Sequence, residues 1–502
     1  MFDKIKRLGI ETGIYGTSTI LGRFLNFLLI PFYTNVLLPQ EYGIVTYVYA
    51  LIAFMNVVYS YGMESAYFKY SSTKEIGTRE QNFSTPFIAL FFTSSIFTSL
   101  IIAAARPIGN AIGLDSSHHY IIDYAGWILF FDTLAIVPFA FLRMERKAKT
   151  FAALKFANIT INVISNLILL LVFKTGIEGI FMSGLLASSL TLFMLVPLIM
   201  RQFTSDFSTD LSRALLKFGL PYVPAGLAAI MVQVVDRPIL RMLTDDATVG
   251  IYQANYRLGI FMMLVVSMVD YAWRPFFLTH AKDPDAKQMF ARILTYFILF
   301  MSVIFIVLTF FIPDLVQIKI FGRYIIHPNY WSGLTIVPIV LLGYMFLGIS
   351  NNMVAGIYIE KKTHYLPAIT FVGAAVNVGA NFLLIPEFGI AGAAWATLFS
   401  YLIMAAMQYV MVQRIYRVSY EWLRLTKIGI SCAIVMGIYY ALPEGSWQWI
   451  WKILSIAVFF LLIYVLKFFE PHELSTLKSL LSRNSLDNNS TPPDTPNNFP
   501  GF

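Results

Sequence analysis

Fourteen stretches of mainly apolar residues follow one another along this chain and constrain its fold more than any other feature. Each is roughly 18 to 25 residues long, enough for an α-helix to cross a hydrocarbon core of about 30 Å. The chain has 502 residues, of which 58% are hydrophobic and only 13% charged, whereas a soluble domain is about a quarter charged. We therefore predict an all-α polytopic membrane protein with about 14 transmembrane helices. The expected spans are residues 12–36, 42–62, 84–106, 120–142, 152–173, 177–200, 214–235, 249–273, 291–313, 333–357, 364–386, 389–412, 424–442 and 447–469.

The distribution of basic residues predicts the orientation. Of the 36 Lys and Arg residues, 27 lie at the N-terminus, in every second connection and in the C-terminal tail, and only six lie in the alternate connections. Because basic loops stay on the cytoplasmic side, we expect both termini to be cytoplasmic. The first span is too long for a signal peptide and leads directly into a second span, so we interpret it as uncleaved. Scattered cations of this kind also disfavour nucleic-acid binding.

Sliding the chain against itself by 207 residues superposes the first two spans on the seventh and eighth. The stretch LIPFYTNVLLPQEYGIVTYVYA then faces DRPILRMLTDDATVGIYQANYR. Gly43, Ile44 and Tyr49 align with Gly250, Ile251 and Tyr256.

A second match relates the fifth span to the eleventh with a shift of 215 residues. Asn162 and Asn166 fall on Asn377 and Asn381, and after a two-residue gap Gly176 and Gly179 fall on Gly389 and Gly392. Six spans separate the copies, so both have the same orientation in the membrane. Such a parallel repeat is typical of transporters that bind substrate between two halves.

The repeat predicts the organisation of the chain. We expect an N-terminal six-helix lobe (1–206), a C-terminal six-helix lobe (207–417), two extra transmembrane helices (418–470) and a cytoplasmic tail (471–502) whose Asn- and Pro-rich end is disordered.

Several classes of function lack their sequence signature. The connections are short, and there is no phosphate-binding loop, dinucleotide-binding loop, HExxH or GxSxG motif. The single cysteine, Cys432, and six scattered histidines offer no metal-ligand spacing. We expect no catalytic residues, no metal and no cofactor, and hence no enzyme.

Ionisable side chains inside spans are costly and are candidates for function. Arg23 lies near the middle of the first span and shares a helical face with Asn26. We interpret this polar stripe as substrate-binding. The alternative is that Arg23 is locked to a buried acid such as Asp132 in the fourth span.

The seventh and eighth spans carry further polar groups. Arg257 has Gln253 one turn before it, and we assign both to substrate binding. Asp236 and Arg237 lie at the end of the seventh span, where they either serve the site or extend to the lipid headgroups. Asp132, Asp236 and Arg237 are the candidates for an ion pair or for coupling, in which either acid could carry H⁺, and coupling to Na⁺ is also open.

The repeated asparagines allow two interpretations. Asn162 and Asn166 in one copy, and Asn377 and Asn381 in the other, lie four residues apart on one helical face. They either hydrogen-bond to neighbouring helices or line a passage suited to sugar hydroxyls. Both interpretations stay open at this point, and we include all four among the candidate substrate-binding residues.

The sequence also resembles a known family. The stretches YGTSTILGRFLNFLLIPFYTNVLLPQEYGIVTYVYALI and DRPILRMLTDDATVGIYQANYRLGIFMMLV, with the asparagine-containing run at 351–403, are similar to the Wzx-type oligosaccharide flippases of the MOP superfamily. The resemblance implies two lobes around a central cavity. It also implies movement of an undecaprenyl-pyrophosphate-linked oligosaccharide to the outer leaflet of the bacterial inner membrane by alternating access, for O-antigen, capsule or exopolysaccharide synthesis. Membrane lipids are expected partners, and a polysaccharide polymerase with its chain-length machinery is a candidate partner.

Three alternatives share parts of this description. A multidrug or metabolite antiporter of the same superfamily should carry an acidic cavity, whereas Arg23 and Arg257 favour an anionic substrate. A flippase for the peptidoglycan precursor would have the same fold. A membrane-embedded glycan polymerase or transferase would need a large catalytic loop, and the short connections argue against one.

Overall fold

The structure is a computed structural model that describes residues 22, 24–25, 27–441, 448–470 and 473. Nearly all of these residues are helical. They divide into two compact units, one made of Met1–Leu294 and Leu308–Ser419, the other of Thr295–Val307 and Tyr420–Phe502. The first unit contains both repeats.

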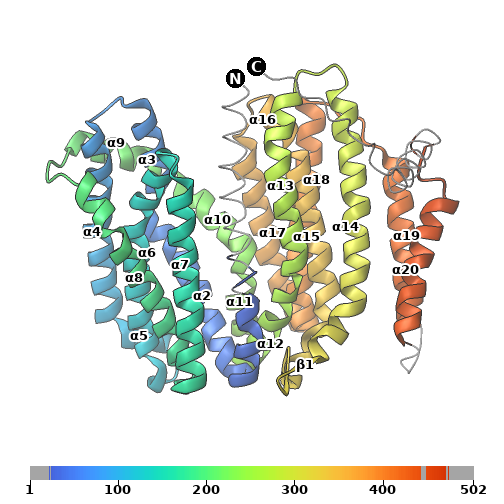
Figure 1. Ribbon diagram of the computed structural model, residues 1–502, viewed down its shortest axis with the longest axis horizontal. Helices are drawn as coiled ribbons and strands as arrows, with labels where there is room; N and C mark the ends of the chain where they lie inside the picture. Colours follow the sequence, from blue (N-terminus) through green and yellow to red (C-terminus); the bar gives the residue numbers. More distant parts are fainter. Residues whose placement is uncertain (1–21, 23, 26, 442–447, 471–472, 474–502) are drawn as a thin grey trace, which may run out of the picture. The chain divides into compact units, whose positions relative to one another are not determined.

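The N-terminal half of the first unit is a bundle in which α4 packs on α6 and α8 packs on both α6 and α7 (Figure 1). A short apolar helix, Phe27–Val36, precedes it. The elements are α2 (Pro39–Ser60), α3 (Met63–Thr73), α4 (Arg79–Ala103), α5 (Ala105–Ala111), η1 (Ser116–His118), α6 (Tyr120–Met144), α7 (Ala148–Leu167) with a π-helical end, η2 (Ile168–Val172), and α8 (Ile177–Gln202).

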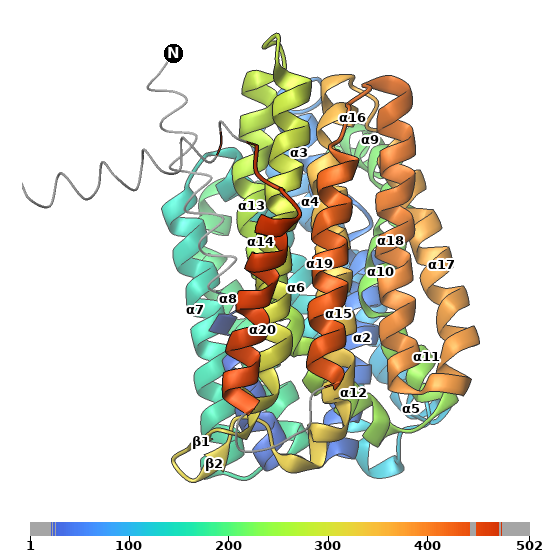
Figure 2. The same ribbon diagram turned by 90° about the vertical axis from the view of Figure 1, so that its right-hand side faces the viewer.

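The C-terminal half is a second bundle, in which α18 packs on α15 and α17. A two-residue antiparallel hairpin follows α14 (Figure 2). The elements are α9 (Thr209–Gly219), α10 (Tyr222–Val234), α11 (Asp236–Leu243), α12 (Asp246–Tyr256), η3 (Arg257–Gly259), α13 (Ile260–His280), α14 (Ala286–Gln317), β1 (Lys319–Ile320), β2 (Arg323–Tyr324), η4 (Pro328–Ile336), α15 (Val337–Met353), α16 (Ala355–Ile359), α17 (Tyr365–Phe388) and α18 (Ile390–Ile415).

The second unit contains α19 (Trp422–Ala441), α20 (Gln448–Val465) and the middle of α14. Arg424 is buried in it and forms an ion pair of 3.0 Å with Glu473. Its guanidinium also lies over the ring of Phe468, at 4.4 Å.

The expected spans fall on helices throughout the described residues. Twelve helices are long and apolar enough to cross a membrane, and a bent pair makes a thirteenth candidate. The first expected span is described only in part, as Phe27–Val36. The all-helical, multi-pass prediction is confirmed, and the count of 14 stays a prediction.

The seventh expected span is a broken helix. Thr209–Gly219 and Tyr222–Val234 meet at an angle of 43°. Pro221 lies in this break, where it has no amide hydrogen to continue the hydrogen-bond ladder. Gly219 also lies against the left-handed Gly62, whose missing Cβ would meet Gly219 at 2.8 Å, so the break anchors α9 to the start of α3.

The two repeats share local geometry as well as sequence. Gly176 and Gly389, which align in the sequence, both cap the following helix with a positive φ, 61° and 54°. Their ψ values, −138° and −129°, also agree. L-residues with a Cβ rarely adopt this conformation, which explains why both copies carry glycine there.

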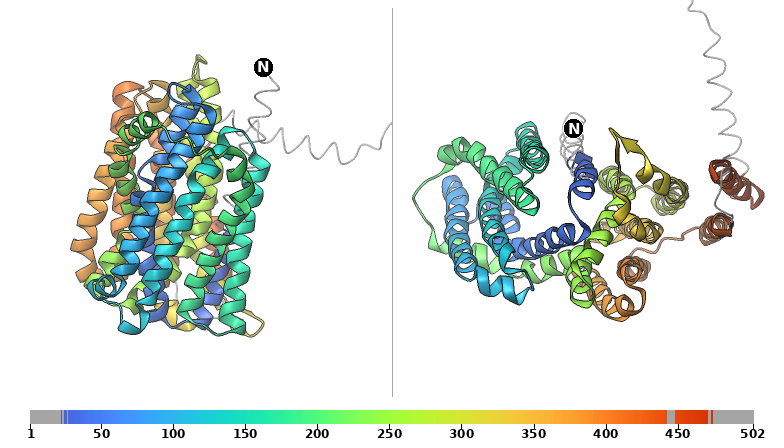
Figure 3. Two further views of the ribbon diagram at one scale, coloured as in Figure 1. Left: turned by 90° about the vertical axis from the view of Figure 1, so that its left-hand side faces the viewer. Right: turned by 90° about the horizontal axis from the view of Figure 1, so that it is seen from below.

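The two bundles meet where α2 crosses α12 (Figure 3, right). A Cβ on Gly43 would lie 2.6 Å from the carbonyl carbon of Asp246, and one on Gly250 would lie 2.9 Å from that of Pro39. The two glycines are the residues that the 207-residue shift aligns. The contact is therefore reciprocal, with each repeat using the same position to approach the other.

Candidate functional site

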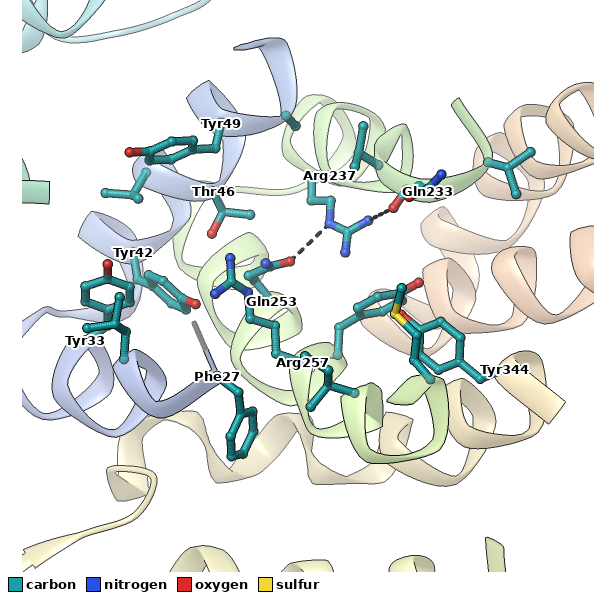
Figure 4. Close-up of a pocket in the computed structure, with 18 of the residues that line it drawn as sticks. Phe27, Tyr33, Tyr42, Thr46, Tyr49, Gln233, Arg237, Gln253, Arg257 and Tyr344 are labelled. Atoms are coloured by element: carbon teal, nitrogen blue, oxygen red, sulfur yellow. Dashed lines mark hydrogen bonds between the residues drawn. The ribbon is translucent and has the colours of Figure 1, made fainter. Parts of the chain in front are cut away.

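A cavity of about 850 Å³ lies between the two bundles of the first unit. Side chains from Phe27–Val36, α2 and α7 line one wall, and side chains from α10, α12, α15 and α18 line the other. Figure 4 shows the polar and aromatic groups that converge on it. Its volume lies within the range of about 300–1,000 Å³ that is usual for small-molecule sites.

Arg257 supplies the accessible positive charge of this cavity. It begins η3 directly after α12, where the helix tightens and directs the side chain toward the wall formed by α2 (Figure 4). It forms no hydrogen bond or ion pair with any residue that the structure describes, although its charge acts on Tyr33, Tyr42 and Tyr49. Among the described lining residues, none is acidic, so the guanidinium is available to an anionic ligand.

Arg237 also reaches the cavity but is already paired. Its guanidinium lies 2.6 Å from the Asp236 carboxylate, and both side chains are almost fully buried, with 7% and 3% exposed. It further donates to the side chain of Gln253 at 3.1 Å and to the backbone carbonyl of Gln233. Tyr252 donates to the other Asp236 oxygen at 2.5 Å. This network fixes the wall of the cavity, and its burial does not fit simple extension to lipid headgroups.

The paired state of Arg237 explains why Gln253 is held in place. Gln253 is 8% exposed and lines the cavity with its Oε1 already accepting from Arg237. The structure thus brings together three sequence candidates, Gln253, Arg237 and Arg257, on one wall. Asp236 lies behind them and is absent from the described lining.

The four candidate asparagines do not share one environment. Asn162 lines the cavity, together with Asn158 one turn earlier. Asn166 is 1% exposed and accepts from the Tyr33 hydroxyl at 3.0 Å. Its amide donates to the Asn162 carbonyl at 2.8 Å.

The second copy repeats this local hydrogen bond. The amide of Asn381 donates to the Asn377 carbonyl at 2.8 Å and to its side-chain oxygen at 2.9 Å. Asn377 and Asn381 are 1% and 0% exposed and do not line the cavity. Three of the four asparagines, all except Asn162, are thus outside the described cavity lining. Asn166 bonds to a tyrosine on another helix, whereas the bonds between Asn377 and Asn381 stay within α17.

Three further candidates have different outcomes. Arg23 and Asn26 lie outside the residues that the structure describes, so their role stays a prediction. Asp132 lies in a second pocket inside the N-terminal bundle, with Lys155 and Ser188.

Tyrosine side chains form a large part of the cavity lining, and none of them was predicted from the sequence to bind substrate. Their only sequence signal was the alignment of Tyr49 with Tyr256. The tyrosines lining the cavity are Tyr33, Tyr42, Tyr49, Tyr256, Tyr344 and Tyr401.

The described lining of the cavity supplies groups that can bind a ligand. Among the described residues there is no group of three or more His, Cys, Asp or Glu side chains placed to hold a metal ion. Among its described lining residues, the cavity offers one unpaired guanidinium, that of Arg257, with amide and hydroxyl groups around it. Such a set suits an anionic ligand that also carries hydroxyl groups.

The described residues form a multi-pass fold of apolar helices with a cavity between two bundles, and solved membrane proteins share this fold. The structure is similar to the lipid II flippase MurJ in an inward closed conformation, with a TM-score of 0.73 and 15% identity over 90% of this chain and 98% of that chain. It is also similar to the inward-facing conformation of a multidrug resistance MATE family transporter of the MOP superfamily, with a TM-score of 0.58 and 12% identity over 78% of this chain and 94% of that chain.

The model of the polysaccharide biosynthesis protein family matches residues 8–279, which is more than half of the chain. The chain therefore belongs to this family. It is also 32% identical over 114 residues to the uncharacterized membrane protein MJ1068 of Methanocaldococcus jannaschii, a match that spans 22% of each chain.

Proposed function

We propose that this protein is a flippase that moves an undecaprenyl-pyrophosphate-linked oligosaccharide from the cytoplasmic to the outer leaflet, for the synthesis of a surface polysaccharide. The observation that carries the proposal is Arg257, an unpaired guanidinium in a cavity whose described lining contains no acid. A guanidinium binds phosphate oxygens in a bidentate geometry. The amide and hydroxyl groups of Asn162, Thr46 and Thr370 in the same lining suit the sugar.

The movement would occur by alternating access of the two bundles. The distribution of basic residues places the loop before α2 on the outer side. The α2–α12 crossing lies near the N-terminal ends of both helices, and we therefore place it on the outer side as well. We propose that the described conformation is closed toward the outside and that the substrate enters from the cytoplasmic side of a bacterial inner membrane. Separation of α2 from α12 would then release it outward.

The source of energy and the partners belong to the same proposal. The sequence has no nucleotide-binding motif, so coupling to H⁺ or Na⁺ is the expected drive. A polysaccharide polymerase with its chain-length machinery is the expected partner on the outer side, since it would consume the transported repeat unit.

A flippase for the peptidoglycan precursor is the second candidate. The likeness to MurJ extends over 90% of the chain, but at 15% identity it concerns the fold alone. Both candidates need a cation for pyrophosphate, so Arg257 supports them equally. The family favours the first candidate, and the choice of glycan has to be made by assay.

The test uses proteoliposomes with purified protein and fluorescent undecaprenyl-pyrophosphate oligosaccharide, and it measures how fast label on one leaflet becomes accessible on the other. We expect protein-dependent transfer that Arg257→Ala abolishes and Arg257→Lys partly retains, because Lys keeps the charge but loses the bidentate geometry. Arg201→Ala, an exposed change at the end of α8 outside the cavity lining, is the matched control.

Three outcomes would contradict parts or all of the proposal. Normal transfer by Arg257→Ala would remove this residue from the site. Transfer of lipid II alone would favour the peptidoglycan precursor, and proton- or sodium-driven efflux of a cationic dye without lipid transfer would favour an antiporter.

A further inference from the structure

A second pocket, of about 420 Å³, lies within the N-terminal bundle between α6, α7 and α8. It is smaller than the central cavity and is lined by a different set of side chains. Asn158 belongs to both linings. The pocket therefore adjoins the central cavity as a side chamber, and we call it the side pocket.

The side pocket contains two opposite charges that do not form an ion pair. Asp132 on α6 and Lys155 on α7 both line it, and they attract each other electrostatically without direct ion-pair contact. The Ser188 hydroxyl lies beside the Asp132 carboxylate, and the Lys155 ammonium lies 4.3 Å from the centre of the Phe139 ring. Separated charges inside a bundle are costly unless a ligand or water satisfies them.

Neutral polar groups complete the lining. Asn158 donates to Thr191 at 2.8 Å and to the Ala187 carbonyl at 3.1 Å. These bonds use its amide hydrogens and hold the side chain in one orientation. Its side-chain oxygen is thereby fixed between the two cavities as an acceptor.

A charged pair at the rim is internally balanced. Glu64 and Arg143 line the side pocket and form a salt bridge with each other, each with 47% of its side chain exposed. With Asp132 and Lys155 inside, the lining has two acids and two bases. A pocket without net charge has little preference for a strong anion or cation, and it suits a neutral ligand with many hydrogen-bonding groups.

One face of the side pocket is aromatic. Phe139 and Phe151 meet edge to face with ring centroids 5.4 Å apart, and both line it. A pyranose presents a ring of hydroxyls, each able to donate and accept, and an apolar C–H face. A carboxylate, an ammonium and an amide match the hydroxyls, and aromatic rings match the C–H face.

We infer that the side pocket is a glycan subsite that holds one neutral sugar residue of the lipid-linked oligosaccharide while the pyrophosphate contacts Arg257 in the central cavity. This inference rests on the proposed function. Asp132 accepts from adjacent hydroxyls, Lys155 donates to ring or hydroxyl oxygens, and Asn158 marks the passage between the two subsites.

The experiment measures binding of two probes to the purified protein in lipid nanodiscs. One is undecaprenyl pyrophosphate without sugar, and the other is undecaprenyl pyrophosphate bearing a neutral repeat unit that the wild-type protein transports. We expect Asp132→Asn and Ser188→Ala to bind the glycosylated probe about 10-fold more weakly and the sugar-free probe as tightly as wild type does. Unchanged binding of the sugar-free probe also shows that each variant is folded.

Arg257→Ala is the reciprocal control and should weaken the binding of both probes. If Asp132→Asn binds each probe as tightly as wild type does, the side pocket is not a glycan subsite. The inference would also be wrong if Asp132→Asn kept its preference for the glycosylated probe but its transport no longer depended on a pH gradient. Asp132 would then carry a proton. If wild type binds neither probe, the proposed function fails and the inference fails with it.

Discussion

The reciprocal glycine contact between α2 and α12 allows a quantitative prediction for Gly43→Ala. The added methyl group would lie 2.6 Å from the Asp246 carbonyl carbon and still nearer to its oxygen. Ordinary van der Waals contact begins at 3.4 Å, so the two backbones must separate by at least 0.8 Å. Overpacking of this kind costs about 1–3 kcal/mol.

This free energy destabilises the conformation in which α2 and α12 are in contact. A change of about 1–3 kcal/mol shifts an equilibrium between two states by about 5- to 150-fold. We therefore expect Gly43→Ala to populate a conformation with the α2–α12 contact opened. Gly250→Ala should act in the same direction, because its Cβ would meet the backbone of Pro39.

The assay labels a cysteine in the cavity from one side of the membrane. Thr370→Cys, on the cavity wall, is placed in a Cys432→Ser background, and a membrane-impermeant maleimide is added from outside. Gly43→Ala should raise the labelling rate, whereas Gly379→Ala, whose Cβ would meet nothing within 4 Å, should not. Equal labelling of the two variants would refute the role of the crossing as the outer closure.

Three further predictions concern stability. Gly389→Ala should lower the free energy of unfolding by about 1–3 kcal/mol, measured by thermal denaturation, because φ is 54° at this position. Tyr33→Phe should cost about 1 kcal/mol in the same measurement, because it removes the donor to Asn166. Burial raises the pKa of Glu473, but hydrogen bonds and the charge of Arg424 outweigh it and hold this pKa below its ordinary value. The resulting stabilisation is present above the ordinary pKa of about 4.3 and is lost as the pH falls through the folded pKa; Glu473→Gln should remove this pH dependence.

The helices could be predicted from the sequence because each is an apolar run long enough to cross the hydrocarbon core as a helix. The repeat could also be found, since Gly176 and Gly389 are required by the same backbone conformation in both copies. Hydropathy alone does not reveal the bend near Pro221, but the proline itself indicates a break because it has no amide hydrogen for the helical hydrogen bond.

The site was harder to predict because burial depends on tertiary contacts. Asn162 and Asn166 are four residues apart on one helix, but only Asn162 lines the cavity, since the Tyr33 hydroxyl takes up Asn166. Lys155 was counted among the basic residues that set orientation. Its place in the side pocket depends on the packing of α7 against α6, which no local pattern contains.

The repeat makes the scaffold symmetric but leaves the chemistry asymmetric. The 207-residue shift aligns Arg257 with Ala50, and the 215-residue shift aligns Lys155 with Thr370. Ala50 and Thr370 both line the central cavity, so each of these two charged positions corresponds to a small cavity-lining residue in the other copy. Glycines that set backbone geometry are retained in both copies because both must cross and cap in the same way. The two pocket-lining charges Arg257 and Lys155 are not duplicated. The two walls of the passage therefore differ, and we expect a substrate with unlike ends to take a single favoured orientation between them.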